Sequence, residues 1–233
     1  MTKRRAILGV LMAIALGGCA TTGASPSQGS DDPFKVVNKE TFAFNKHLDK
    51  GLIKPTAEAY VDVVPLPLRR GVSDVFANLG DIEVIINESL QGRWWPVLSE
   101  SARLLVNSTL GLLGVVDVAT PMGLLAHQAD FGETLAVWGV RSGPYIVLPL
   151  FGPSDVRDGF GLGVDTYTNP TTYLASSAAM WGAYTAQLID TRSHYLHQGF
   201  LIEMAAGGQE YTFVRDAFWQ KRRNLIRSRR AKD

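Results

Sequence analysis

Two histidines and a run of glycines are the residues of this 233-residue chain whose spacing could bind a ligand directly. His194 and His197 stand three residues apart, so on a helix they would share a face as metal ligands. No cysteine lies near them, and surface histidines are the stronger interpretation. Gly159, Gly161 and Gly163 form G-x-G-x-G, which lacks the spacing and the preceding strand of a dinucleotide-binding motif. We interpret these as close-packing or hinge glycines, and we predict no metal and no cofactor.

The motifs of common hydrolases and nucleotide-binding enzymes are absent from the sequence. It contains no G-x-S-x-G, H-E-x-x-H, Walker A or S-x-x-K pattern. Asp155, Arg157 and Asp158 indicate the start of a helix, with Ser154 as its cap and acidic residues in its first turn. A paired-carboxylate hydrolase site is the enzymatic alternative at this place. We therefore predict that the chain is not an enzyme.

The single cysteine, Cys19, marks a site of covalent modification. Residues 3–5 are basic, and residues 6–16 form an apolar run that is too short to span a bilayer. The segment Leu16-Gly17-Gly18-Cys19 resembles a bacterial lipobox, in which the cysteine is acylated with diacylglycerol and palmitate after the signal is cut. The alternatives are a non-lipidated signal with a chance cysteine, or a short anchor. The residue after Cys19 is Ala20 rather than Asp. By resemblance to the sorting rule for lipoproteins of enteric bacteria, this favours the outer membrane over retention at the inner membrane.

These features divide the chain into a signal peptide over 1–18, a flexible tether over 19–32, a helical domain over 33–220 and a basic tail over 221–233. Removal of the signal would change the formal net charge from +1 to −2, with +6 on the tail and −8 on residues 19–220. The tail could lie on anionic headgroups, or it could be a solvated, frayed helix end. The near-neutral total charge argues against an obvious nucleic-acid binder. The single cysteine excludes a disulfide framework within the chain.

Apolar residues recur at three- and four-residue intervals along most of the mature chain, which predicts an all-α fold. The pattern predicts helices over 34–52, 68–79, 82–90 and 97–113. Strand-like alternation is confined to Tyr145–Leu148, which leaves room for one short hairpin.

The middle of the chain is poor in charge, with eight charged residues among the 86 between Leu104 and Ile189 and none over 166–189. We interpret the uncharged stretch as a loop followed by a helix with an aromatic stripe. The stripe residues are candidates for facing lipid or a channel, and they are Tyr173, Met180, Trp181 and Tyr184. Two environments explain this composition: an unusually apolar soluble core, or partial immersion in lipid, where helices satisfy their own backbone groups.

An ordered series of short motifs from about Asp32 to Gln220 is similar to the VacJ/MlaA family of outer-membrane lipoproteins. Each motif is weak alone, and the ordered series carries the resemblance. The motifs are Asp32-Pro33, Asn38, Phe42-Ala43-Phe44-Asn45, Pro65-x-Pro67-x-Arg69-x-Gly71-x-Ser73, Asn78-Leu79, Leu90-Gln91-Gly92, Arg103, Asn107, Leu110-Gly111, Gly114, Asp117-x-Ala119, Phe131-Gly132-x-Thr134-Leu135, Trp138-Gly139-Val140, Gly143-Pro144-Tyr145-x-x-Leu148-Pro149, Gly152, Arg157-Asp158, Thr191-Arg192, Tyr211 and Val214-Arg215. The chain departs from the family at Ala43, where a polar residue is frequent, and in its strongly basic tail.

The resemblance implies a single ring-like helical domain partly embedded in the outer membrane, lipid-anchored and facing the periplasm and the inner leaflet. It implies removal of mislocalised phospholipids from the outer leaflet and their transfer to a soluble periplasmic carrier for return to the inner membrane. The implied partners are phospholipids, a trimeric porin and that carrier, with no nucleic acid. The only bound group expected is the covalent lipid on Cys19, and phospholipid is the transported ligand.

The family element carried by Phe42, Phe44 and Asn45 is our candidate for a contact that shapes the channel or holds it closed. The alternative is ordinary helix core. Two rival functions are a structural or porin-docking lipoprotein without a lipid channel, and a periplasmic lipid hydrolase. A polar tunnel would favour transport, whereas a Ser–His pair or two converging carboxylates in a cleft would favour a hydrolase.

Overall fold

The computed structural model describes residues 32–196 and 198–230. The chain separates into two compact units, Met1–Asp32 and Pro33–Asp233. The predicted signal peptide, Cys19, the tether up to residue 31, His197 and the last three residues of the predicted tail lie outside the described residues. Everything below concerns the second unit.

The second unit consists of helices and one small hairpin. In chain order the elements are α2 (Lys35–Leu48), the π-helix η1 (Asp49–Ile53), α3 (Lys54–Val63), α4 (Leu66–Leu90), α5 (Trp94–Thr109), the 3₁₀ helix η2 (Thr120–Met122), α6 (Phe131–Val137), β1 (Tyr145–Leu148), β2 (Gly152–Asp155), α7 (Val156–Thr168), the 3₁₀ helix η3 (Pro170–Tyr173), α8 (Ser177–His194), α9 (Gln198–Ala206) and α10 (Glu210–Arg230).

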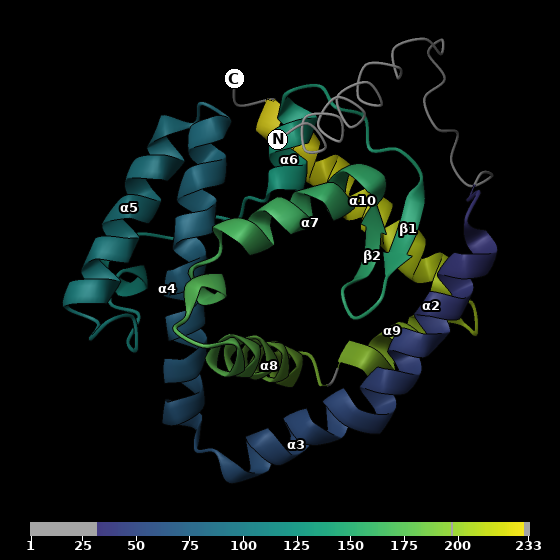
Figure 1. Cartoon of the computed structure of the whole chain (residues 1–233), viewed down its shortest axis with the longest axis horizontal. Coiled ribbons are helices and arrows are strands. Elements are labelled where there is room, and N and C mark those ends of the chain that lie inside the picture. Colours follow the sequence, from purple (N-terminus) through teal and green to yellow (C-terminus); the bar gives the residue numbers. More distant parts are fainter. Residues whose placement is uncertain (1–31, 197, 231–233) are drawn as a thin grey trace, which may run out of the picture. The chain divides into compact units, whose positions relative to one another are not determined.

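These elements contact one another in a closed circuit (Figure 1). From α2 the contacts run through η1, α3, α8 and α4, and then through α6 and α7 to β1, which returns to α2. α5 packs on α4, and α10 contacts α6, α9 and β2. The predicted all-α, ring-like fold with one short hairpin is confirmed. Within the part of the chain that the structure describes, none of the helices has both the length and the hydropathy to cross a membrane.

The predicted helices are present, but several of their ends differ. The segments expected over 68–79 and 82–90 are one helix, α4, which begins after Pro65 and ends at Leu90. α5 begins at Trp94 and stops at Thr109, because Gly111 brings the following backbone close to Asn107. The cap of α7 is Asp155, whose carboxylate accepts a hydrogen bond from the Asp158 amide at 2.8 Å. Ser154, the predicted cap, lies one residue earlier, and both residues belong to β2.

The G-x-G-x-G glycines lie within α7 rather than in a ligand-binding loop. At Gly161 a Cβ atom would come within 2.4 Å of the Gly132 nitrogen, so this glycine allows the close approach of α7 to α6. Gly163 faces open space. The close-packing interpretation therefore holds for Gly161.

Polarity is distributed in the reverse of the usual order for a soluble domain. The largest fully buried side chains are Glu88, Glu100, Asn87, Thr134 and Asp155. Leu113, Val63 and Trp95, by contrast, are 80%, 79% and 77% exposed. The apolar residues of the charge-poor middle therefore do not form a large interior core, and extended exposed apolar surface marks contact with a partner or a membrane.

Candidate functional site

Two asparagines of α2 hold the hairpin by its backbone. Asn38 donates to the Tyr145 carbonyl oxygen at 3.0 Å and accepts from the Val147 amide at 2.8 Å. Two helical turns later, Asn45 donates to the Leu148 carbonyl oxygen at 2.9 Å and accepts from the Leu150 amide at 2.9 Å. The seven-residue spacing places both amides on one face of the helix. They satisfy the free edge of β1, whose other edge pairs antiparallel with β2.

Aromatic side chains pack around the same junction. Phe42 meets Tyr211 of α10 edge to face, with ring centroids 5.8 Å apart. Tyr145 and Tyr211 are buried with Val147 in a small apolar cluster. Phe44 points elsewhere and is 53% exposed. The three predicted residues therefore have different roles. Phe42 packs against another ring, Phe44 is exposed, and Asn45 holds the hairpin by hydrogen bonds to its backbone, which we call the clamp.

A buried ionic network fixes α10 to the first turns of α6 and α7. Arg222 lies 2.6 Å from Asp130, 2.5 Å from Asp158 and 3.5 Å from Glu133. Burial would raise the pKa of Asp130, but the hydrogen bonds and charge of Arg222 hold it below its ordinary value. One more acid, Glu133, keeps a raised pKa because burial dominates.

The second buried arginine of α10 extends this network to α4. Arg229 contacts the fully buried Glu88 and lies 3.0 Å from Glu133. Glu88 also pairs with Arg93 at 2.7 Å. Since α10 runs unbroken across the predicted boundary at 220/221, Arg222 and Arg229 belong to the folded unit rather than to a separate tail.

A second polar cluster lies between α4 and α5. Arg103 lies 3.8 Å from Asp81 and 3.6 Å from Glu100, and all three are at least 95% buried. Glu100 also accepts a hydrogen bond from the His127 amide at 2.6 Å. Burial and the adjacent Glu100 carboxylate raise the pKa of Asp81 to about 7.

A third group of acids joins α4 to α7 and α6. Asp165 accepts hydrogen bonds from Asn87 at 3.1 Å and from the Phe131 amide at 3.0 Å. Burial, with the charges of Asp165 and Asp130, raises the pKa of Glu83 to about 7. The sequence analysis did not predict these three clusters, because the burial of an acidic side chain depends on tertiary contacts that the residue type does not reveal.

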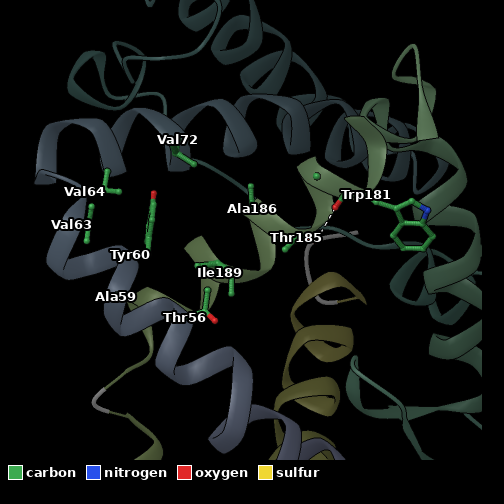
Figure 2. A pocket seen from close by; sticks show the side chains of 11 residues that line it. Thr56, Ala59, Tyr60, Val63, Val64, Val72, Trp181, Thr185, Ala186 and Ile189 are labelled. Atoms are coloured by element: carbon green, nitrogen blue, oxygen red, sulfur yellow. Dashed lines mark hydrogen bonds between the residues drawn. The ribbon is translucent and has the colours of Figure 1, made fainter. Parts of the chain in front are cut away.

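Trp181 of the aromatic stripe borders an open apolar groove of about 760 Å³ between α3, α4 and α8, which is called the cavity below (Figure 2). The lining residues are Thr56, Ala59, Tyr60, Val63, Val64, Val72, Trp181, Gly182, Thr185, Ala186 and Ile189. Of the predicted stripe, Trp181 lines the cavity, while Tyr173 is 62% exposed. Tyr184 shares a hydrogen bond of 2.6 Å with Thr172, and Met180 is half-buried. An apolar lining of this size suits acyl chains rather than headgroups.

A Ser–His pair lies beside this cavity, but it lacks the geometry of a hydrolase. Ser73 Oγ lies 3.0 Å from His194 Nε2 and donates to Asp190 at 2.9 Å. Asp190 is nearest the same ring nitrogen, Nε2, at 3.7 Å, whereas a catalytic triad needs the acid on Nδ1. These contacts, with that of Tyr60 to Asp190, tie α3, α4 and α8 together. Among the described residues, no group of three or more His, Cys, Asp and Glu side chains is arranged to hold a metal ion.

Comparison with known proteins gives consistent matches along the chain. The family model for the MlaA lipoprotein matches residues 30–225. The intermembrane phospholipid transport system lipoprotein MlaA of Escherichia coli (strain K12) is 33% identical over 220 residues, which cover 91% of this chain and 86% of that protein. The protein of the same name from Haemophilus influenzae is 28% identical over 225 residues, covering 94% and 89%.

One solved structure has a similar fold. It is described as "Structural basis for maintenance of bacterial outer membrane lipid asymmetry", and one of its chains aligns with a TM-score of 0.74 and 30% sequence identity. The alignment covers 84% of this chain and 100% of that chain.

Proposed function

Because this chain belongs to the MlaA lipoprotein family, we propose that it is an outer-membrane lipoprotein that removes mislocalised phospholipids from the outer leaflet. The lipids pass to a soluble periplasmic carrier for return to the inner membrane, so the outer membrane keeps its lipid asymmetry. The names of the relatives and the description of the similar solved structure support this proposal. A trimeric porin and the carrier are the proposed protein partners, and Cys19 is the proposed lipidation site.

The reversed distribution of polarity is the observation that carries the proposal. A folded unit whose Glu88 and Glu100 are fully buried while Leu113 is 80% exposed matches hydrocarbon outside and polar groups inside. A headgroup that moves between leaflets meets a cost of many kcal/mol in bare hydrocarbon. Polar side chains that line a groove through the circuit of helices would lower that cost. The exposed Tyr173 and Trp181 are proposed to face lipid, and the apolar cavity beside Trp181 would hold acyl chains.

The process needs no covalent chemistry, and we propose that the chain is not an enzyme. In the Ser73–His194–Asp190 group, Asp190 lies nearest the same imidazole nitrogen as Ser73 rather than Nδ1, and this supports the proposal. The rival function is a structural or porin-docking lipoprotein without a lipid channel. It shares the anchor and the fold, so only a transport measurement separates the two.

The test is complementation of a strain that lacks its MlaA-family gene, read out as phospholipid in the outer leaflet and as detergent sensitivity. This chain is expected to restore both. The Cys19→Ala variant, produced at the same level, is expected to restore neither. Full rescue by the unlipidated chain would refute the anchored model, and rescue of porin assembly alone would favour the docking alternative.

We further propose that the contact of α2 with the hairpin shapes or closes the lipid route. Deletion of Ala43 and Phe44 would rotate the end of α2 by about 200° and carry Asn45 away from Leu148 and Leu150. The expected result is a change in outer-leaflet phospholipid that exceeds any fall in protein amount.

Asn45→Ala is the milder companion of this deletion, because it removes the clamp and keeps the helix in register. Immunoblotting and outer-leaflet labelling measure amount and asymmetry in the same cells. If both variants merely lose folded protein, Phe42 and Asn45 are ordinary core residues and the gating proposal is abandoned.

A further inference from the structure

One half-buried arginine in the first turn of α4 has no acidic partner. Arg69 donates from Nε to the Val64 carbonyl oxygen at 3.0 Å, and no described residue accepts from the other nitrogens of its guanidinium. Every other arginine that the structure describes as buried or half-buried pairs with a carboxylate, as Arg192 does with Asp49 at 2.6 Å. A cation withdrawn from water costs free energy unless a counter-charge accompanies it. Arg69 therefore has an open position for an anion.

The guanidinium of Arg69 lies at one end of the apolar cavity between α3, α4 and α8. Val64, its hydrogen-bond partner, and Tyr60 both line that cavity, and so does Val72, three residues after Arg69 on α4. Figure 2 shows Tyr60 and Val64 at one end and Trp181 at the other. Burial raises the pKa of the Tyr60 hydroxyl, and the nearby charge of Arg69 opposes this rise. The apolar cavity thus ends beside an unpaired cation.

The other polar side chains at this end are turned toward one another. Ser73 donates to Asp190 at 2.9 Å and lies 3.0 Å from His194 Nε2, and the Tyr60 hydroxyl donates to Asp190 at 3.3 Å. Asp190 is 5% exposed, so its carboxylate is covered by these neighbours. A guanidinium carries more N–H groups than any other side chain, and Arg69 keeps most of its own free.

We propose that this end of the cavity is a phospholipid site, in which Arg69 binds the phosphodiester and one acyl chain lies along the cavity between α3 and α8. A guanidinium pairs with two phosphate oxygens at once, which an ammonium group does not do. None of the described residues that line the cavity is charged, and its volume of about 760 Å³ is in the range of sites for single small molecules. The proposal rests on the proposed function and names a residue that would recognise its ligand.

The site would distinguish lipids by their phosphate rather than by the rest of the headgroup. Phosphatidylethanolamine and phosphatidylglycerol both have the phosphodiester, and diacylglycerol has the same acyl chains without it. We therefore expect the two phospholipids to bind equally well. Diacylglycerol should bind about tenfold more weakly or worse, because it leaves the guanidinium unpaired.

Photo-crosslinking tests the site directly. The full lipidated chain, purified in detergent, is illuminated with phosphatidylglycerol that carries a diazirine near the end of one acyl chain. We expect cross-linked peptides from α3 and α8, and we expect excess unlabelled phosphatidylethanolamine or phosphatidylglycerol to suppress them. Equal suppression by diacylglycerol, by palmitate or by inorganic phosphate would overturn the proposal, because each of these lacks either the phosphodiester or the acyl chain.

Two substitutions separate the phosphate contact from the chain contact. Arg69→Gln should lower the cross-linking yield about tenfold. Arg70→Gln removes the same charge from an exposed neighbour and should leave the yield within about twofold of the parent. Ala186→Phe fills the cavity and should lower the yield as well, whereas Ala178→Phe, at an exposed position of α8 outside the cavity, should not. Equal yields for Arg69→Gln and Arg70→Gln would contradict the assignment.

Melting temperature in detergent separates lost binding from lost folding. Arg69→Gln also loses the hydrogen bond to the Val64 carbonyl oxygen, whereas Ala186→Phe keeps it. Full cross-linking of Ala186→Phe, with the melting temperature of the parent, would overturn the proposal.

The parent chain is also tested for rescue of lipid asymmetry. Rescue without cross-linking in the cavity refutes the site and leaves the proposed function intact. Cross-linking in the cavity without rescue supports the site and counts against the function.

Discussion

Two asparagine side chains, Asn38 and Asn45, make the hydrogen bonds to β1 and the turn after it that a neighbouring strand would otherwise make. Asn38 is 2% exposed and serves the Tyr145 carbonyl and the Val147 amide at once. Asn38→Ala leaves both groups buried without that partner and should lower the free energy of unfolding by about 2–4 kcal/mol. Thermal unfolding in detergent measures it, with the exposed Asn224→Ala on α10 as the matched control. Equal melting temperatures for the two variants would refute the clamp.

The buried acid Asp81 makes stability depend on pH. Its pKa rises from 3.8 to about 7 in the folded chain, because it is buried beside Glu100. Between about pH 4 and pH 7 the folded chain holds a proton that the unfolded chain has released, so stability falls as pH rises through this window. Asp81→Asn should therefore lose less stability than the parent between pH 5 and pH 8. The exposed Asp62→Asn should keep the parent's slope, and an unchanged slope for Asp81→Asn would contradict the assignment.

For individual residues, the sequence predicted some contacts and gave no indication of others. Asn45 was identified through the family resemblance together with Phe42, and both lie at the hairpin junction. Nothing in the local pattern separates the buried Arg222 from the exposed Arg223, because they are neighbours in one basic run. The cap of α7 was placed one residue early, since Ser154 and Asp155 are both good caps.

Among the elements, α10 is held in place by Arg222 and Arg229, which pair with acids of the polar interior. Arg222→Ala removes the cation nearest to Asp130 and Asp158, and it leaves the buried Glu133 with Arg229 alone. Removal of one partner from such a network costs about 3–5 kcal/mol. Arg223→Ala, on the exposed side of the same helix, should change stability by less than about 0.5 kcal/mol. Unfolding by urea in detergent compares the two, and a similar small effect for both would show that the network does not hold α10.

Helix periodicity predicted α2, α4 and α5, because their apolar residues recur at helical spacing. In α4 and α5, however, the buried positions are mostly polar. Their ends were harder to predict. α4 continues through the expected break because Gly80 and Asp81 are compatible with a helix inside a packed pair. The end of α5 depends on Asn107 and Gly111, whose role appears only in three dimensions.

For the whole molecule, the reversed polarity predicts behaviour independent of the lipid anchor. The exposed Leu98 and Leu105 of α5 are 63% and 65% accessible and would face water in a soluble chain. The purified Cys19→Ala chain should therefore require detergent and float with vesicles when the detergent is removed. Vesicle flotation measures this. A monodisperse chain in plain buffer would contradict the immersion model.

Composition alone left a soluble apolar core and lipid immersion as equal explanations for the charge-poor middle. The structure shows that Leu105 is exposed and Glu88 fully buried, which argues against a large apolar core and supports the proposal of lipid immersion. The direction in which such side chains point depends on contacts between helices distant in the sequence, and no local pattern contains it.

The junction of α2 with α10 has a consequence for biogenesis. Lys46 and Glu210 meet at 2.6 Å although 164 residues separate them. Closure over such a span is slow, so we expect the circuit to close only after the C-terminal helix has been exported. Until then the apolar exterior has no membrane around it, and the nascent chain should depend on an escort protein in the periplasm. Pulse-chase protease sensitivity would follow this step, and rapid protection before α10 emerges would refute it.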